Sequence, residues 1–430
     1  MSHVAPAQDV PALVRHLRRM VDAGRLAAAR PLLSAVARIA PASAELWEVE
    51  ALLAIEEGRT AEARALLDRG VATFPQAPAL RLLLGRMLLE SGGAAAARAH
   101  LLAALALRSG DVAVRLALSS AQAACGDTAA ALVTLTQGPA RDPLLTAAAM
   151  LLLVGQRDFA NAVALGEAAR AEGATDACVL GLLGHAQSSL GRHAAAAPTY
   201  AAALALAPED LYVRHLAAAS GLARDLGRAP ADYIRVVFDG YAAHFDLHLL
   251  GLGYRIPGVA RALLAEARGP VLDLGCGTGL MAVALSDLNL GTFIGVDLAP
   301  RMLAAAAARG LYAELFEADL PAYLAAERRR FGLVLAGDVL PYFGSLVTLF
   351  GGVAARLAPG GRFLFSAETL PGEAAGWRLG PQGRFAHAPA HLAAAAAAAG
   401  LSVVLLRAEV VRFEHDAPVP GMIGLLERPA

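Results

Sequence analysis

The chain of 430 residues is long enough for two or three domains, and 57% of its residues are hydrophobic. This excess does not predict a membrane protein, because the longest apolar stretch, 392–406, holds seven consecutive alanines and is interrupted by Gly400. The formal net charge of −1 argues against a nucleic-acid-binding surface. The first residues lack the basic segment and apolar core of a signal peptide, so we expect a cytoplasmic protein.

Three cysteines, Cys125, Cys178 and Cys276, lie far apart in the chain and form no C-x-x-C pair. They indicate neither a zinc site nor a disulfide framework, and we expect no metal. Cys276 stands inside a glycine-rich stretch, where its small size is a sufficient reason for its presence.

The first half of the chain repeats with a period of 34 residues. Short polar breaks that contain a glycine recur at Gly24, Gly58, Gly92 and Gly126, and an alanine stands five residues after each. After a contraction of three residues the register returns at Gly191 and Pro208. A unit of this length with two short amphipathic helices resembles the tetratricopeptide repeat, with about six units over residues 9–210.

This resemblance implies an all-α solenoid. The concave face of such an array commonly binds a peptide or a partner protein. The repeats could instead hold two copies of the chain together, or only support the domain that follows. We expect a protein or peptide partner and leave a homodimer open.

From about residue 268 the pattern changes to short apolar strands that alternate with helices. The strand-like runs are PVLDLG, FIGVDL, AELFEAD, FGLVLAGD and GRFLFSAE, and the helix-like stretches between them are 279–289, 300–309, 321–329 and 345–357. Such alternation predicts an α/β fold with a parallel sheet that binds its ligand at the carboxyl ends of the strands. We place this domain at 236–430 and a linker at 211–235.

A glycine-rich loop follows the first strand in the stretch VLDLGCGTGL, 271–280. Glycines at Gly275, Gly277 and Gly279 allow a ligand to approach the backbone closely. A dinucleotide-binding loop would need glycine where Leu280 stands, and Asp273 would repel a pyrophosphate. The loop therefore predicts a ligand without phosphates.

The D-x-G-x-G-x-G pattern resembles motif I of the class I S-adenosylmethionine-dependent methyltransferases. Four further motifs follow in the order of that family: FIGVDL, LFEADL, GDVLPY and LAPGGRFLFS. The resemblance implies a Rossmann-like domain with a seven-stranded, mostly parallel sheet. Its last strand, at 421–428, would be antiparallel. The cofactor would be S-adenosylmethionine.

The resemblance also implies which residues bind this cofactor. Asp273 would orient the glycine loop, in which Cys276 lies, and the amine end of the cofactor. Asp297, with Leu298 beside it, would accept the two ribose hydroxyls. Asp319 would accept the adenine amino group and Leu320 would contact the ring. Asp338, in GDVLPY, would face the methionine part.

The segment 237–257 carries an apolar helix face that includes Phe238, Tyr241 and Phe245. It could simply pack against the sheet. Its residue pattern, however, resembles that of a tetratricopeptide-containing group of methyltransferases related to the trans-aconitate methyltransferase type. In similar enzymes this helix covers the cofactor, which implies a contact from Tyr241 and makes Tyr254 and Arg255 partners of the cofactor carboxylate.

Methyl transfer from a sulfonium needs an aligned acceptor and no covalent intermediate, so no catalytic triad is expected. The candidates for catalytic residues are Tyr342 and Glu368, which follow the fourth and fifth strands, and His387, which precedes the helix at 389–399 and could otherwise only cap it. His415 is a further candidate, in a loop between the last two strands.

The sequence thus predicts methyl transfer to a small-molecule, carrier-bound or protein acceptor that it does not identify. An alternative is an adaptor whose methyltransferase domain binds cofactor without turnover. A third possibility is a methyltransferase for small carboxylates with a solenoid that only dimerises. An arginine in the acceptor pocket, such as Arg378 or Arg384, would favour this third possibility.

Overall fold

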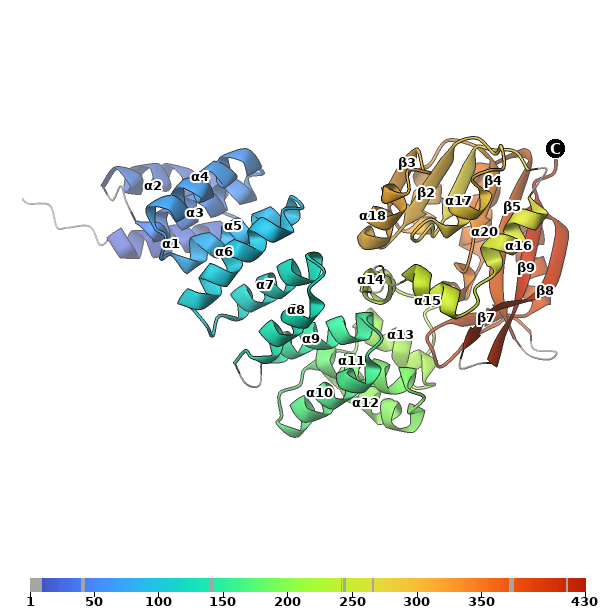
Figure 1. Cartoon of the computed structure of the whole chain (residues 1–430), viewed down its shortest axis with the longest axis horizontal. Coiled ribbons are helices and arrows are strands. Elements are labelled where there is room, and N and C mark those ends of the chain that lie inside the picture. Colours follow the sequence, from blue (N-terminus) through green and yellow to red (C-terminus); the bar gives the residue numbers. More distant parts are fainter. Residues whose placement is uncertain are drawn as a thin grey trace, which may run out of the picture. The chain divides into compact units, whose positions relative to one another are not determined.

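The computed structural model describes residues 10–39, 43–139, 142–240, 242, 245–264, 267–370, 375–414 and 417–430 (Figure 1). The chain forms two compact units, Met1–Ala149 and Met150–Ala430. The last helices of the repeat region therefore belong to the same unit as the α/β domain. Within the described residues no helix is both long and apolar enough to cross a membrane.

The first unit consists of helices joined by short turns. They are α1 (Val10–Asp22), α2 (Leu26–Ile39), α3 (Ala44–Glu56), α4 (Thr60–Thr73), α5 (Pro78–Glu90), α6 (Ala94–Leu107), α7 (Val112–Ala124) and α8 (Thr128–Thr136), and α9 (Pro143–Gly155) passes into the second unit.

The predicted repeat positions coincide with the turns and contacts of these helix pairs. Gly24, Gly58, Gly92 and Gly126 all end a helix with φ between 69° and 81°, a left-handed conformation that favours glycine. The alanines five residues later, Ala29, Ala63, Ala97 and Ala131, are fully buried. A larger side chain there would hold the paired helices apart.

Four helices continue the repeat region in the second unit: α10 (Phe159–Ala171), α11 (Ala177–Ser189), α12 (His193–Leu206) and α13 (Leu211–Ala219). Aspartates begin three of them, because their carboxylates accept a backbone N–H of the first turn, at Asp158, Asp176 and Asp210. Then follow α14 (Ala231–Asp239), α15 (Phe245–Gly251) and α16 (Ile256–Leu263). Much of 211–235, expected as a linker, is therefore helical.

The α/β domain comprises β1 (Val271–Leu274), α17 (Leu280–Leu285), β2 (Phe293–Asp297), α18 (Pro300–Ala308), β3 (Glu314–Glu317), α19 (Leu320–Ala326), β4 (Phe331–Ala336), the 3-10 turn η2 (Leu340–Tyr342), α20 (Val347–Arg356), β5 (Leu357–Thr369), β6 (Trp377–Leu379), β7 (Phe385–His387), α21 (Pro389–Ala398), β8 (Ser402–Glu414) and β9 (Ala417–Glu427). Buried side chains of α19, α20 and α21 pack on one face of the sheet, and those of α16 and α17 pack on the other.

The strand order confirms the predicted topology. Strands β3, β2, β1, β4 and β5 are parallel neighbours, and β9 pairs antiparallel with both β5 and β8. These seven strands are the predicted sheet, and β9 covers the strand expected at 421–428. The predicted number of strands was wrong by two, since the sheet also contains β6 and β7. There is room for them because β4 ends at Ala336 while β5 continues to Thr369. The free edge of β5 then pairs with β7 at Glu368 and Thr369, and β6 pairs with β7.

The repeat helices of the second unit form hydrogen bonds with the α/β domain. Ser188 donates to the carbonyl of Pro381 at 3.0 Å, and the Nε2–H of His215 donates to the carbonyl of Gly383 at 2.9 Å. Upstream, Gly155 at the end of α9 meets Gly240 so closely that a Cβ on Gly155 would lie 2.7 Å from the Cα of Gly240. Only residues without a side chain fit at that crossing.

Replacing Gly155 with alanine should therefore lower the free energy of unfolding by about 1–3 kcal/mol, because the backbone atoms at the crossing cannot move aside freely. Urea unfolding followed by circular dichroism measures this change. The matched control is Gly110→Ala, since nothing lies within 4 Å of a Cβ added there. Equal stabilities of the two variants would show that the crossing yields without cost.

Candidate active site

One cavity of about 490 Å³ lies at the carboxyl ends of the parallel strands. Residues at or just beyond the ends of β1, β2, β3 and β4 line it, including Gly277, Asp297, Leu320 and Asp338. This is the position predicted for the ligand, because the strand ends of a parallel sheet meet at one edge. The cavity holds most of the residues that the sequence singled out.

The glycine loop has a backbone that other residues would not adopt easily. Gly275, Gly277 and Gly279 have φ values of 65°, 54° and 91°. A Cβ on Gly275 would also lie 2.5 Å from Val339. Gly275, Cys276 and Gly277 line the cavity, whereas Gly279 begins α17 and lies outside the lining. At Gly275 and Gly277 the loop therefore presents its backbone, without a side chain, to a ligand.

The carboxylate of Asp297 is held in place by the loop. Its Oδ2 accepts the N–H of Gly277 at 2.8 Å, and its Oδ1 accepts the N–H of Ala299 at 2.9 Å. Burial raises the pKa of Asp297, although these amide hydrogen bonds act in the opposite direction. Each oxygen keeps a second lone pair, so a carboxylate in this position can accept two neighbouring hydroxyls.

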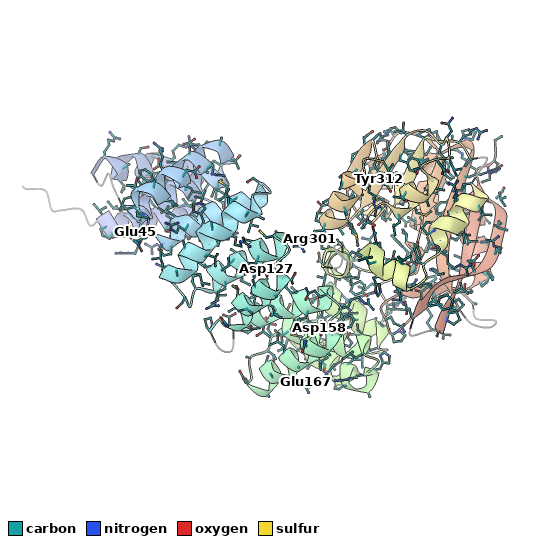
Figure 2. All side chains as sticks on the ribbon, in the orientation of Figure 1. Glu45, Asp127, Asp158, Glu167, Arg301 and Tyr312 are labelled. Carbon is teal, nitrogen blue, oxygen red and sulfur yellow. The ribbon has the colours of Figure 1, made fainter. Side chains whose placement is uncertain are left out.

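Asp273 lies behind the loop and does not line the cavity. The hydroxyl of Tyr312, labelled in Figure 2, donates to Oδ2 of Asp273 at 2.6 Å. Its Oδ1 is buried and has no hydrogen-bond partner among the described residues. Burial raises the pKa of Asp273 to about 7, the charge of Asp297 adds to this effect, and the Tyr312 hydrogen bond opposes it.

This raised pKa predicts how the stability of the cofactor-free protein depends on pH. An acid whose pKa is near 4 when unfolded and about 7 when folded lowers stability as pH rises between these values. Asp273→Asn has no carboxyl group to ionise at this position. Its free energy of unfolding should therefore rise relative to that of the wild type as pH increases, by about 4 kcal/mol at most. Urea unfolding at several pH values measures the difference. A constant difference from acid to alkaline pH would contradict the assignment.

Asp319 and Leu320 line the cavity beyond the end of β3. The carboxylate of Asp319 pairs with Arg228 at 3.2 Å. Arg228 also lines the cavity, and it comes from the segment between α13 and α14. The sequence analysis missed Arg228, because no motif marks it and only the tertiary fold brings it to the strand ends.

At the other end of the cavity, Asp338 has a positive φ of 59° and pairs with Arg412 at 3.2 Å. Arg412, on β8, also binds Glu368 and Glu414. Arg384 binds the same two glutamates, at 2.7 and 2.8 Å. Burial acts against the charge of Arg412, yet the three carboxylates hold its pKa above its usual range. We name these five residues the charge cluster.

The predicted catalytic residues do not meet at one point. Tyr342 lines the cavity, and burial raises the pKa of its hydroxyl well above the usual range. Glu368 does not line the cavity but contacts it through Arg384 and Arg412. His387 is fully buried outside the lining, with Nε2 3.3 Å from the carbonyl of Leu340, and burial lowers its pKa to about 4. A role as base at the cavity does not fit this position.

Of the residues predicted upstream, Tyr254 lines the cavity. Arg255 is exposed, lies outside the lining and is 3.9 Å from Glu409. Tyr241 and His415 lie outside the described residues. Among the described residues, no group of histidine, cysteine and acidic side chains could hold a metal ion.

Comparison with known proteins identifies the domains. Residues 271–361 match the family model of a methyltransferase domain. Residues 20–87 match that of a tetratricopeptide repeat. Both predicted domain classes are thus confirmed. S-adenosylmethionine is the predicted cofactor of this methyltransferase domain, and the glycine loop and Asp297 fit it.

The chain is similar to two curated proteins over part of their length. It is 40% identical over 101 residues to a ribosomal protein L11 methyltransferase of Xylella fastidiosa, which covers 23% of this chain and 31% of that protein. It is 39% identical over 84 residues to the human methyltransferase-like protein 27, which covers 18% of this chain and 34% of that protein. The chain therefore spans about a third of the length of these relatives.

Among solved structures, the chain is similar to the magnesium protoporphyrin IX methyltransferase of Synechocystis with bound SAM, at 18% identity and a TM-score of 0.32 over 40% of this chain and 78% of the other. It is also similar to the N-methyltransferase NodS of Bradyrhizobium japonicum in complex with S-adenosylhomocysteine, at 17% identity and a TM-score of 0.34 over 41% and 86%. The narrower resemblance, to the trans-aconitate methyltransferase type, stays a prediction.

Proposed function

We propose that this chain transfers the methyl group of S-adenosylmethionine to an acceptor bound in the same cavity. The observation that carries the proposal is the hydrogen bond between the glycine loop and Asp297, both of which line the cavity. The amide of Gly277 orients the carboxylate, and the absence of side chains at Gly275 and Gly277 leaves room for a nucleoside.

We assign the parts of the cofactor to the cavity as follows. Asp297 accepts the ribose hydroxyls, and Leu298, Asp319 and Leu320 lie on the adenine side. Asp338 and Tyr254, at the opposite end of the strand edge, lie on the side of the methionine part. Bound there, the cofactor supplies a methyl group on a positively charged sulfur.

The protein's own contribution is to hold the acceptor in line and to exclude water. Tyr342 stays protonated, because burial raises the pKa of its hydroxyl. It is therefore a hydrogen-bond donor for positioning rather than a base. The charge cluster fixes the strand ends that surround it.

The repeats of the first unit are a second binding region in this proposal. They are matched by a repeat family over 20–87, and such repeats commonly bind a protein or peptide. We propose a protein or peptide partner for them, with association of two copies as the other possibility. Light scattering of the purified chain distinguishes a homodimer from a monomer that is free to bind another protein.

Calorimetric titration tests the cofactor site directly. The purified protein is first stripped of any copurified nucleoside, and S-adenosylmethionine and S-adenosylhomocysteine are then added separately. Binding of both supports the proposal, and binding of neither overturns it. Formation of S-adenosylhomocysteine from S-adenosylmethionine in the presence of cell extract supports transfer. Cofactor binding without any turnover would favour the adaptor alternative.

A further inference from the structure

We propose that the acceptor is a small, uncharged aromatic molecule, held between the methyltransferase domain and the last repeat helices. The inference rests on the proposed function and names its substrate class. It assigns to the repeat helices of the second unit a role in the active site itself, besides any role in binding a partner.

The repeat helices form one wall of the cavity. Phe159 of α10, His185 and Ser189 of α11 and Leu216 of α13 line the same cavity as Asp297. The wall is anchored, because Ser188 and His215 donate hydrogen bonds to the carbonyls of Pro381 and Gly383. The volume of about 490 Å³ must hold the cofactor as well, so the remaining space suits a small acceptor.

Aromatic rings surround this part of the cavity. His185 lies 6.2 Å from Phe159 and 6.0 Å from Tyr233 between ring centroids. Phe238 and Tyr342 meet edge to face, with centroids 5.5 Å apart. All five rings line the cavity. Burial lowers the pKa of His185 to about 4, so its imidazole is neutral. Such a lining favours a flat ring over an aliphatic chain.

The charges at this end of the cavity balance. Arg384 and Arg412 bind Glu368 and Glu414, and Arg412 also binds Asp338. A third guanidinium, that of Arg157, lines the cavity and interacts with the charge of Glu414. Three cationic groups thus face three carboxylates. These protein groups therefore leave no net charge that would attract a charged acceptor in preference to an uncharged one.

Because of this balance, an arginine in the pocket no longer indicates a carboxylate acceptor. Arg384 does line the cavity, the feature expected for a carboxylate acceptor. Its guanidinium is already engaged by Glu368 and Glu414, so a substrate carboxylate would have to displace them. Arg378 does not line the cavity. The arrangement therefore favours an uncharged acceptor.

The test uses the full chain saturated with S-adenosylhomocysteine. Indole is the uncharged probe, and indole-3-carboxylate is the same ring system with a negative charge. Saturation-transfer NMR titrations should show indole bound and the carboxylate bound more weakly. The variant Ser189→Trp fills the cavity from a half-exposed position on α11 and should weaken indole binding at least about tenfold. S-adenosylhomocysteine affinity should change by less than about twofold.

The control variant is Ser120→Trp, at an exposed position of α7 in the first unit, and should leave both affinities unchanged. Stronger binding of the carboxylate would overturn the uncharged acceptor. Unchanged indole binding in Ser189→Trp, or no indole binding to the wild type, would overturn the repeat wall as acceptor site. Absence of S-adenosylhomocysteine binding is a separate outcome, because it would refute the proposed function itself.

Discussion

Asp297→Ala is expected to lower the affinity for S-adenosylhomocysteine about 30-fold or more, which corresponds to about 2–4 kcal/mol. The variant would lose the two hydrogen bonds that we propose Asp297 accepts from the ribose hydroxyls. It also frees the N–H groups of Gly277 and Ala299, which the carboxylate holds at 2.8 and 2.9 Å in the cofactor-free protein. The glycine loop then has to be ordered when the ligand binds, which adds to the loss. Calorimetric titration measures the difference.

Two further variants show what the carboxylate itself contributes. Asp297→Asn keeps the shape, but its NH₂ group cannot accept an N–H, so its affinity should lie between those of the alanine variant and the wild type. Asp287→Ala removes an exposed acid that pairs only with Arg261 among the described residues, and should bind like the wild type. Wild-type affinity in Asp297→Ala would refute the assignment of this residue to the cofactor.

Replacing Arg412 with methionine should lower the free energy of unfolding by about 3–5 kcal/mol. The side chain of Arg412 is only 4% exposed, and it pairs with Asp338, Glu368 and Glu414. Methionine fills much of the same volume, so the loss reports mainly on charge. Without Arg412, three carboxylates stay close together with Arg384 as the nearest balancing cation in the cluster.

Chemical unfolding measures the effect of the Arg412 substitution on stability. The pH dependence of this effect shows whether charge is its cause. The loss should shrink in acid, because protonated carboxyl groups no longer repel one another. Arg407→Met is the matched control on the same strand, since Arg407 is exposed and pairs only with Glu409 among the described residues. It should change stability by about 0.5 kcal/mol or less. A loss for Arg412→Met that does not depend on pH would point to packing instead of charge.

Much of the fold follows from local patterns. The left-handed turns after each repeat helix need glycine, so Gly24, Gly58, Gly92 and Gly126 mark them in the sequence. The alternation of apolar strands and helices predicts the parallel sheet. The two extra strands, β6 and β7, are short and leave no such signal. They form because β5 extends beyond β4, which depends on the register between distant segments.

His387 shows where a local interpretation goes astray. Its place after a strand and before a helix is compatible with the cavity edge or with the interior. The residues around it decide between the two: it is fully buried, beside Leu340 and stacked on His391 at a centroid distance of 5.5 Å. Nothing in the stretch RFAHAPAHL indicates whether His387 lies at the cavity edge or in the interior.

The sequence by itself determined the two domain classes, the repeat period and the glycine loop with its neighbour Asp297, because each depends on residue types at short, regular spacing. Tertiary structure alone decided the end of the cavity that we propose for the acceptor. The charge cluster joins Asp338, Glu368, Arg384, Arg412 and Glu414 from four separate segments, and another wall of the cavity comes from repeat helices more than 100 residues earlier. Such contacts arise from chain folding over long separations, which no local pattern encodes.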